Sequence, residues 1–218
     1  MRKTLFVNCA GNPKYCASEH IKPFLRQPYE IINAEFENLP ADLSCYSHVI
    51  IGGSIAPSYE SPWQSRLYSW VERLINHDIP TLGICYGHQI LVRVYLGKQY
   101  VRKRDCENIG WDEITLVADD LLLGTKGDIW VPFAFHGYEL YDLPADQVCI
   151  LAKSKNCDVM AYKLIGKKIY GVQPHFEISR DKAIELLRSL DMMPTKNVIE
   201  APTTYDRHHI FFERFFSL

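Results

Sequence analysis

The sequence predicts an α/β fold, a doubly wound and mostly parallel sheet with helices on both faces. Three observations predict it. Strand patterns alternate with amphipathic helix patterns in the first half, the strands are continuous apolar runs, and 218 residues is a normal length for a single α/β domain. Continuous apolar strands are typical of parallel sheets that helices bury on both faces.

The first half contains expected strands at 5–7, 30–34, 47–51 and 79–84, and expected helices at 17–26, 62–77 and 89–96. The third strand is a β-branched run that stops at Gly52. The second helix follows Ser61-Pro62, a common helix start, and carries Leu67 and Leu74 at helical spacing. Gly97 ends the third helix.

The second half is richer in strand. Strands are expected at 112–118, 129–135, 148–153, 158–164 and 168–173, followed by a helix at 179–190. Four phenylalanines between 211 and 216 have near-helical spacing, which favours a terminal helix packed on the core over a partner-binding helix. We therefore expect a single domain over 1–218, with 191–218 as a C-terminal extension packed on it.

Charge and composition exclude several classes of function. The net charge is −2 and no basic stripe is present, so nucleic acid is not expected as a ligand. The densest positive run, from Lys98 to Arg104, is interpreted as a solvated loop or strand edge. No apolar stretch approaches the roughly 18 residues of a membrane span, and the apolar N-terminal run is too short for a signal peptide.

The seven cysteines are scattered without a C-x-x-C pair, so no zinc knuckle is indicated. They fit reduced thiols in a cytoplasmic protein. His208 and His209 are adjacent, and adjacent side chains on a helix diverge by about 100 degrees, so they rarely share a metal ion. Neither a metal nor a cofactor is predicted.

The most informative segment is Gly83-Ile84-Cys85-Tyr86-Gly87, between an expected strand and an expected helix. It is the cysteine form of the nucleophile elbow, a turn so tight that it needs glycines and strains the nucleophile's backbone. The helix N-terminus stabilises a thiolate, and the N–H of Tyr86 lies where an oxyanion forms. A lone cysteine near glycine is usually structural, but the complete pattern favours a nucleophile.

A nucleophilic cysteine needs a base, and the base needs a group that orients it. The best candidates are His175 and Glu177, which follow the expected strand at 168–173. Residues two apart in an extended segment point the same way, so we expect Glu177 to hold one ring nitrogen while the other faces Cys85. His-x-Glu alone also fits a surface loop, and the elbow strengthens the catalytic interpretation.

Paired glycines, Gly52 and Gly53, end the third strand. Without side chains they let a backbone N–H approach a ligand closely, so Gly53 is a candidate second oxyanion donor. Taken alone, an ordinary strand-to-helix turn explains these glycines equally well.

Together the three segments resemble the class I glutamine amidotransferase family, whose pattern is a Gly-Gly turn, then Gly-x-Cys-x-Gly-x-Gln, then His-x-Glu. Order and spacing are similar over about residues 4–190. Ser61-Pro62-Trp63 resembles the stand-alone branch that is similar to GMP synthase. Glu107 to Gly110 and Phe135-His136-Gly137 resemble two further stretches of the family.

The resemblance implies a flavodoxin-like sheet and a cysteine hydrolase that needs no cofactor. The implied site residues are Cys85, His175 and Glu177 as the catalytic triad, Gly53 and Tyr86 as oxyanion donors, and Gln89 and His136 as substrate-binding residues. Cys85 attacks the carboxamide of glutamine, His175 protonates the departing ammonia, and water then releases glutamate from a γ-glutamyl thioester.

The chain departs from the family pattern at two places. The family usually reads Gln-Phe-His-Pro-Glu, whereas Pro174 and Phe176 have exchanged places around His175. Because proline fixes its own φ, the approach of Glu177 to His175 is expected to differ from that in the family. Restoring the family order by Pro174→Phe with Phe176→Pro is expected to leave activity equal or higher. Ser54 stands where the family usually has proline.

Three functions remain open from the sequence. The first is a glutamine amidohydrolase that passes ammonia to a synthetase or other partner. The second is a γ-glutamyl peptidase that uses the same triad. The third is an impaired member kept for binding or regulation. Side chains expected in the pocket, namely Tyr59, Tyr86, His88 and His136, are expected to distinguish glutamine from larger γ-glutamyl substrates.

Overall fold

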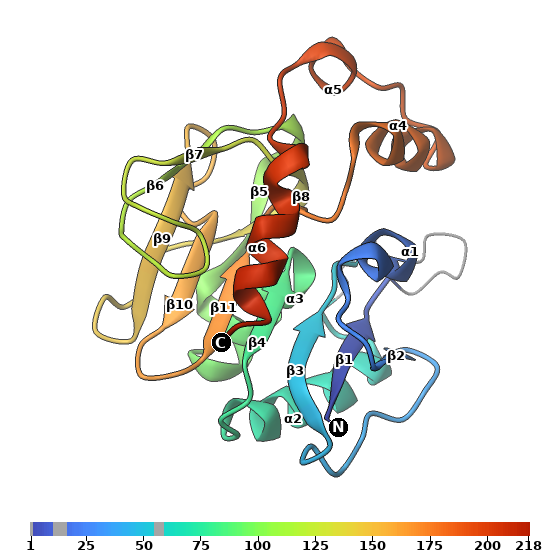
Figure 1. The fold of residues 1–218 in the computed structure, drawn as a ribbon, viewed down its shortest axis with the longest axis vertical. Helices are drawn as coiled ribbons and strands as arrows, with labels where there is room; N and C mark the ends of the chain where they lie inside the picture. Colours follow the sequence, from blue (N-terminus) through green and yellow to red (C-terminus); the bar gives the residue numbers. More distant parts are fainter. Residues whose placement is uncertain (1, 11–16, 55–58) are drawn as a thin grey trace.

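The computed structural model describes residues 2–10, 17–54 and 59–218, in which helices cover one large mixed sheet and two further strands form a small separate sheet (Figure 1). The strands are β1 (Lys3–Asn8), β2 (Tyr29–Asn33), β3 (Tyr46–Ile51), β4 (Thr81–Ile84), β5 (Val101–Trp111), β6 (Ile114–Leu116), β7 (Ile129–Trp130), β8 (Phe133–Leu140), β9 (Val148–Ser154), β10 (Ala161–Leu164) and β11 (Ile169–Val172). The α-helices are α1 (Ala17–Ile21), α2 (Pro62–Ile75), α3 (Tyr86–Tyr95), α4 (Arg180–Ser189), α5 (Lys196–Glu200) and α6 (His208–Phe215).

The sheet has the order β2-β1-β3-β4-β11-β10-β9-β6-β7. The first five of these strands are mutually parallel, and the remaining neighbours pair antiparallel. β4 lies beside β11, with Ile84 opposite Val172. The residues that follow these two strands therefore emerge side by side at the carboxyl edge of the parallel half, where α/β folds place their sites.

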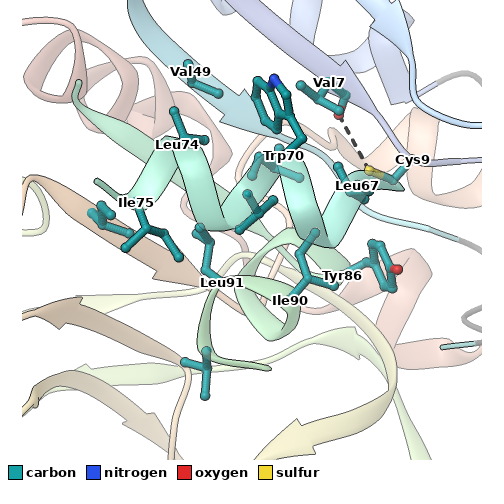
Figure 2. Close-up of a cluster of buried hydrophobic side chains, with 14 of the residues drawn as sticks. Val7, Cys9, Val49, Leu67, Trp70, Leu74, Ile75, Tyr86, Ile90 and Leu91 are labelled. Carbon is teal, nitrogen blue, oxygen red and sulfur yellow. Dashed lines mark hydrogen bonds between the residues drawn. The ribbon is translucent and has the colours of Figure 1, made fainter. Parts of the chain in front are cut away.

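Side chains alternate between the two faces of the sheet. Val49 and Ile51 join one core cluster with α2 and α3, and Ile50 joins a second cluster with α6. Figure 2 shows the first cluster, where Leu67, Trp70, Leu74 and Ile75 of α2 pack beside Ile90 and Leu91 of α3. Helices on both faces confirm the doubly wound architecture that the continuous apolar strands predict.

Some expected boundaries were wrong, and proline explains two of them. The strand expected at 129–135 is split into β7 and β8 around Pro132, which has no N–H to donate to a ladder. The helix expected at 17–26 ends at Ile21, and a 3₁₀ turn containing Pro23 follows. The helix expected from Gln89 begins at Tyr86, immediately after the elbow.

The strand content around the basic run was also underestimated. Residues 101–111 form the strand β5, which pairs with β8 in a separate two-stranded sheet. The strand expected at 112–118 is shorter and is β6, at 114–116. β5 was missed because its exposed charged residues carry no apolar pattern, and cross-strand pairing with β8 holds it.

The C-terminal residues supply one layer of the fold. α6 runs across one face of the sheet in Figure 1, and Phe211, Phe212 and Phe215 on it are buried. Phe211 stacks on Phe176 with ring centroids 4.3 Å apart. Phe212 stacks on Phe24, so the helix contacts both an early segment of the chain and the segment after β11.

Within the described residues, no helix has the length and apolar character needed to cross a membrane. Six cysteines there are free thiols, and Cys16 lies outside the described part of the chain.

We expect Phe211→Ala to destabilise the fold by about 3–5 kcal/mol, because it removes a fully buried ring and leaves a cavity beside Phe176. Urea unfolding followed by circular dichroism measures this. Phe36→Ala is the control, since Phe36 is 65% exposed, and its effect should stay within about 0.5 kcal/mol. Equal effects for the two variants would mean that α6 does not contribute to the folded core.

Candidate active site

Cys85 occupies a strained turn between β4 and α3. Its φ is 53° and its ψ is −102°, and non-glycine residues rarely adopt a positive φ. Its N–H donates to the carbonyl of Val172 on β11, 2.9 Å away, so the neighbouring strand holds the turn in place. A backbone cost of this kind persists only where the surroundings fix it, and such residues cluster at active sites.

The glycines on either side of Cys85 are required by close backbone approach. A Cβ on Gly83 would lie 2.5 Å from the backbone of Gly87, and a Cβ on Gly87 would lie 2.1 Å from the carbonyl oxygen of Ile51. Both distances are far shorter than real contacts. The first turn of α3 therefore packs directly on β3 and β4.

His175 follows β11 and lies against the elbow. Its Nδ1 is 2.6 Å from Oε1 of Glu177, and both side chains are buried. Its N–H donates to the carbonyl of Phe133, 2.7 Å away. A Cβ on Gly53 would lie 3.0 Å from the His175 ring and 3.5 Å from the Cys85 Cβ, so the three residues meet at one point.

Electrostatics favour a charged His175. Burial alone would lower its pKa, but the negative charge of Glu177 and the interaction with Cys85 outweigh burial and raise the pKa of His175 to about 10. An imidazolium next to the sulfur stabilises a thiolate, which is the reactive form of cysteine.

Two backbone donors point to an oxyanion site. The N–H groups of Gly53 and Tyr86 form no hydrogen bond with any residue in the described segments, whereas the N–H of Gly52 donates to Val7. Tyr86 is the first residue of α3, and the first N–H groups of a helix have no partner within the helix. Unpaired donors on both sides of a nucleophile suit a developing negative oxygen.

A cavity of about 700 Å³ opens over Cys85, a volume within the roughly 300–1,000 Å³ of small-molecule sites. It brings together the predicted site residues, because Gly53, Cys85, Tyr86, Gln89, His136, His175 and Glu177 all line it. Lys103, Asp105 and Glu107 line it too, from an irregular part of β5 where the register with β8 shifts between Lys103 and Asn108. Sequence reasoning missed this wall because it placed the basic run on a solvated edge.

Gln89 and His136 are held by internal hydrogen bonds. Gln89 Nε2 donates to Gln173 Oε1 and to the carbonyl of Tyr138, and its Oε1 accepts from Tyr59. Both amide donors of Gln89 are thus occupied within the protein. The ring nitrogens of His136 contact the Tyr138 carbonyl and Asn108, and burial lowers its pKa to about 4.

Two other residues expected in the pocket lie elsewhere. His88 is fully buried against Tyr162 and does not line the cavity. Tyr59 packs against Tyr86 and donates a hydrogen bond to Gln89 Oε1, and it does not line the cavity. The sequence could not separate His88 from the lining, since the expected helix alone does not show which side of α3 faces the cavity.

With Pro174 and Phe176 exchanged, Glu177 still contacts His175, its Oε1 lying 2.6 Å from Nδ1. Phe176 also has a packing role in the fold, so we expect Phe176→Pro to be destabilising. Its ring is fully buried and contacts Phe211, Trp130 and His208. Proline at 176 would remove the ring and leave a cavity among these residues.

Comparisons with known proteins identify the family. The model of the family described as Glutamine amidotransferase class-I matches residues 25–189. Gamma-glutamyl peptidase 3 of Arabidopsis thaliana is 30% identical over 172 residues, 75% of this chain and 68% of that protein. A glutamine-hydrolysing GMP synthase subunit of Methanosphaera stadtmanae is 36% identical over 130 residues, 60% of this chain and 64% of the relative, so the match spans less than two thirds of its length.

Solved structures agree on the fold. A glutamine amido transferase from Methylobacillus flagellatus superposes with a TM-score of 0.80 at 17% identity, over 99% of this chain and 94% of that one. A glutamine amidotransferase from Thermotoga maritima gives a TM-score of 0.76 at 21% identity, over 99% and 96%. These likenesses support the architecture.

We expect Glu177→Gln to lower the pKa of His175 well below about 10, because burial then acts without the carboxylate charge that opposes it. NMR titration of ¹³C-labelled histidine rings measures this midpoint directly. Glu185→Gln is the matched control, since Glu185 is exposed and pairs with Lys182. An unchanged midpoint in Glu177→Gln would show that the carboxylate does not charge the ring.

Proposed function

The chain belongs to the class I glutamine amidotransferase family, and we propose that it hydrolyses the γ-carboxamide of glutamine through a thioester on Cys85. The observation that carries the proposal is the meeting of Cys85, His175 and Gly53 at one edge of the sheet, with Glu177 bonded to the far nitrogen of the ring. A nucleophile, an oriented base and an unpaired backbone donor are the parts that acyl transfer needs.

The first half-reaction forms the thioester. The sulfur of Cys85 attacks the carboxamide carbon, and the oxygen takes up negative charge beside the N–H groups of Gly53 and Tyr86. His175 then gives its proton to the nitrogen as the carbon–nitrogen bond breaks, and ammonia leaves. The imidazolium that Glu177 favours is the proton donor for this step.

The second half-reaction restores the enzyme. Neutral His175 removes a proton from water, which attacks the thioester carbon. The carbon–sulfur bond breaks, glutamate leaves, and the thiolate and imidazolium form again. Glu177 orients the ring through Nδ1.

A γ-glutamyl peptidase is the second candidate, and the cavity favours it specifically. The cavity extends to Lys103, Asp105 and Glu107, which have no ion-pair partner among the described residues. This charged wall offers contacts for the part of a γ-glutamyl conjugate that lies beyond the scissile amide. The relative named gamma-glutamyl peptidase 3 supports this chemistry for the same fold.

We also infer an ammonia-accepting partner for the glutamine reaction. The relatives from Methanosphaera stadtmanae and Methanobrevibacter smithii are, by their names, subunits of a glutamine-hydrolysing GMP synthase and so parts of a larger enzyme. A synthetase or another acceptor chain would use the ammonia that Cys85 chemistry releases. The peptidase reaction needs no such partner, so the substrate decides between the two arrangements.

We expect wild-type protein to release glutamate from L-glutamine, and Cys85→Ser to release none, because serine lacks the reactive thiolate. Glutamate formation from L-glutamine and from a γ-glutamyl dipeptide measures both candidate activities. Turnover of the dipeptide alone would replace the amidohydrolase by the peptidase. A third outcome is that the folded protein releases no glutamate from either substrate and a glutamine-like electrophile does not label Cys85. That outcome would indicate a binding or regulatory member.

We expect His175→Asn to reduce turnover of the active substrate at least about a hundredfold, the usual scale for a positioned acid and base. His136→Asn is the control, because His136 lines the cavity but both of its ring nitrogens contact the protein. Steady-state kcat at neutral pH is the measurement. A larger loss in His136→Asn than in His175→Asn would move the base to His136.

A further inference from the structure

The short segment that carries His175 and Glu177 is held by two backbone contacts. On one side, the N–H of His175 donates to the Phe133 carbonyl, 2.7 Å away on β8. On the other side, the carbonyl of Phe176 lies 2.9 Å from Nδ1 of His208, the first residue of α6. The second contact fixes the peptide that joins Phe176 to Glu177.

Other side chains enclose His208. It is fully buried, and its ring contacts Trp130, Phe176 and Tyr205. Its Nε2 lies 3.1 Å from the hydroxyl oxygen of Thr204. Because a carbonyl can only accept, Nδ1 carries the proton and donates to Phe176, and Nε2 accepts from Thr204.

The ring of His208 is held neutral by its buried position. Burial is the largest effect on its pKa and lowers it to about 4, against smaller raising effects from the Phe176 carbonyl and Glu177. The ring is therefore neutral at ordinary pH and adds no positive charge that would compete with His175 for Glu177. A lysine or arginine here would supply a donor together with such a charge.

We propose that His208 is a positioning residue for the catalytic pair, and that it acts by hydrogen-bonding the peptide between His175 and Glu177. This inference rests on the proposed function of Cys85 and His175 and assigns a part in that site to the C-terminal segment. His208 lies beyond residues 25–189, which the family model matches. The sequence motif around His175 therefore gives no indication of it.

The proposal predicts which atom of residue 208 matters. Asparagine places its amide N–H near the position of Nδ1, whereas glutamine reaches the position of Nε2. His208→Asn should keep the bond to Phe176, and His208→Gln should lose it with a side chain of the same polarity. We expect kcat to fall at least about tenfold in His208→Gln, with little change in KM, and to recover within about threefold in His208→Asn, since misplacement of catalytic groups is costly.

A second readout does not depend on turnover. The rate at which iodoacetamide alkylates Cys85, and the NMR titration midpoint of His175, both report the Cys85–His175–Glu177 geometry. In His208→Gln the midpoint should move below that of wild type, because Glu177 is no longer held against the ring. If wild type proves inactive on glutamine and on the dipeptide, these readouts still test His208 while the proposed function fails separately.

Two controls separate positioning from general loosening. Tyr205→Phe keeps the ring beside His208 and leaves the Phe176 contact intact, so it should match wild type. Phe215→Leu should lower the unfolding midpoint without moving the His175 midpoint, because Phe215 is buried on α6 against His48, away from Glu177.

The comparison among these variants decides the question. Equal behaviour of His208→Asn and His208→Gln, whether both normal or both impaired, would overturn the proposal. An equal shift of the His175 midpoint in Phe215→Leu would overturn it as well, because the effect would then belong to the packing of α6 as a whole.

Discussion

The site depends on the close packing of the first turn of α3 against the sheet. Glycine at positions 83 and 87 is the only residue type that allows this approach, since any Cβ would overlap backbone atoms of Gly87 or Ile51. The approach forces Cys85 into its positive φ and turns its sulfur toward the cavity. It also leaves the N–H of Tyr86 without a helical partner, so one constraint accounts for both the proposed nucleophile and a candidate oxyanion donor.

His175, the proposed base, depends on a different constraint, the burial of a charged pair. A carboxylate taken out of water is costly unless it is paired, and Glu177 has its partner in His175. The same burial that penalises the two charges strengthens their attraction. The pair is therefore stable only while the segment from 175 to 177 keeps its geometry, and that requirement explains why β8 and α6 both bond to its backbone.

The sequence was sufficient for features that depend on local chemistry. Continuous apolar strands predicted the sheet, and the glycine spacing around Cys85 predicted the elbow. It was insufficient where distant segments meet. The wall formed by Lys103, Asp105 and Glu107 depends on the pairing of β5 with β8, and the exposed charges of that strand carry no pattern that indicates a cavity. The contact between His208 and Phe176 joins residues 32 positions apart, and no motif links them.

Different kinds of contact thus hold Cys85 and His175 in place. Backbone packing in the parallel part of the sheet positions Cys85, and this packing tolerates no substitution at Gly83 or Gly87. The segment after β11, which carries the proposed base, is held by backbone bonds to Phe133 and His208 and by side-chain packing against α6. The side-chain packing can change while the geometry survives. The exchanged Pro174 and Phe176 illustrate this freedom, because Phe176 is a buried anchor for α6 while Glu177 keeps its bond to His175. A departure from the family pattern beside His175 can therefore reflect a different set of packing contacts that holds the same geometry.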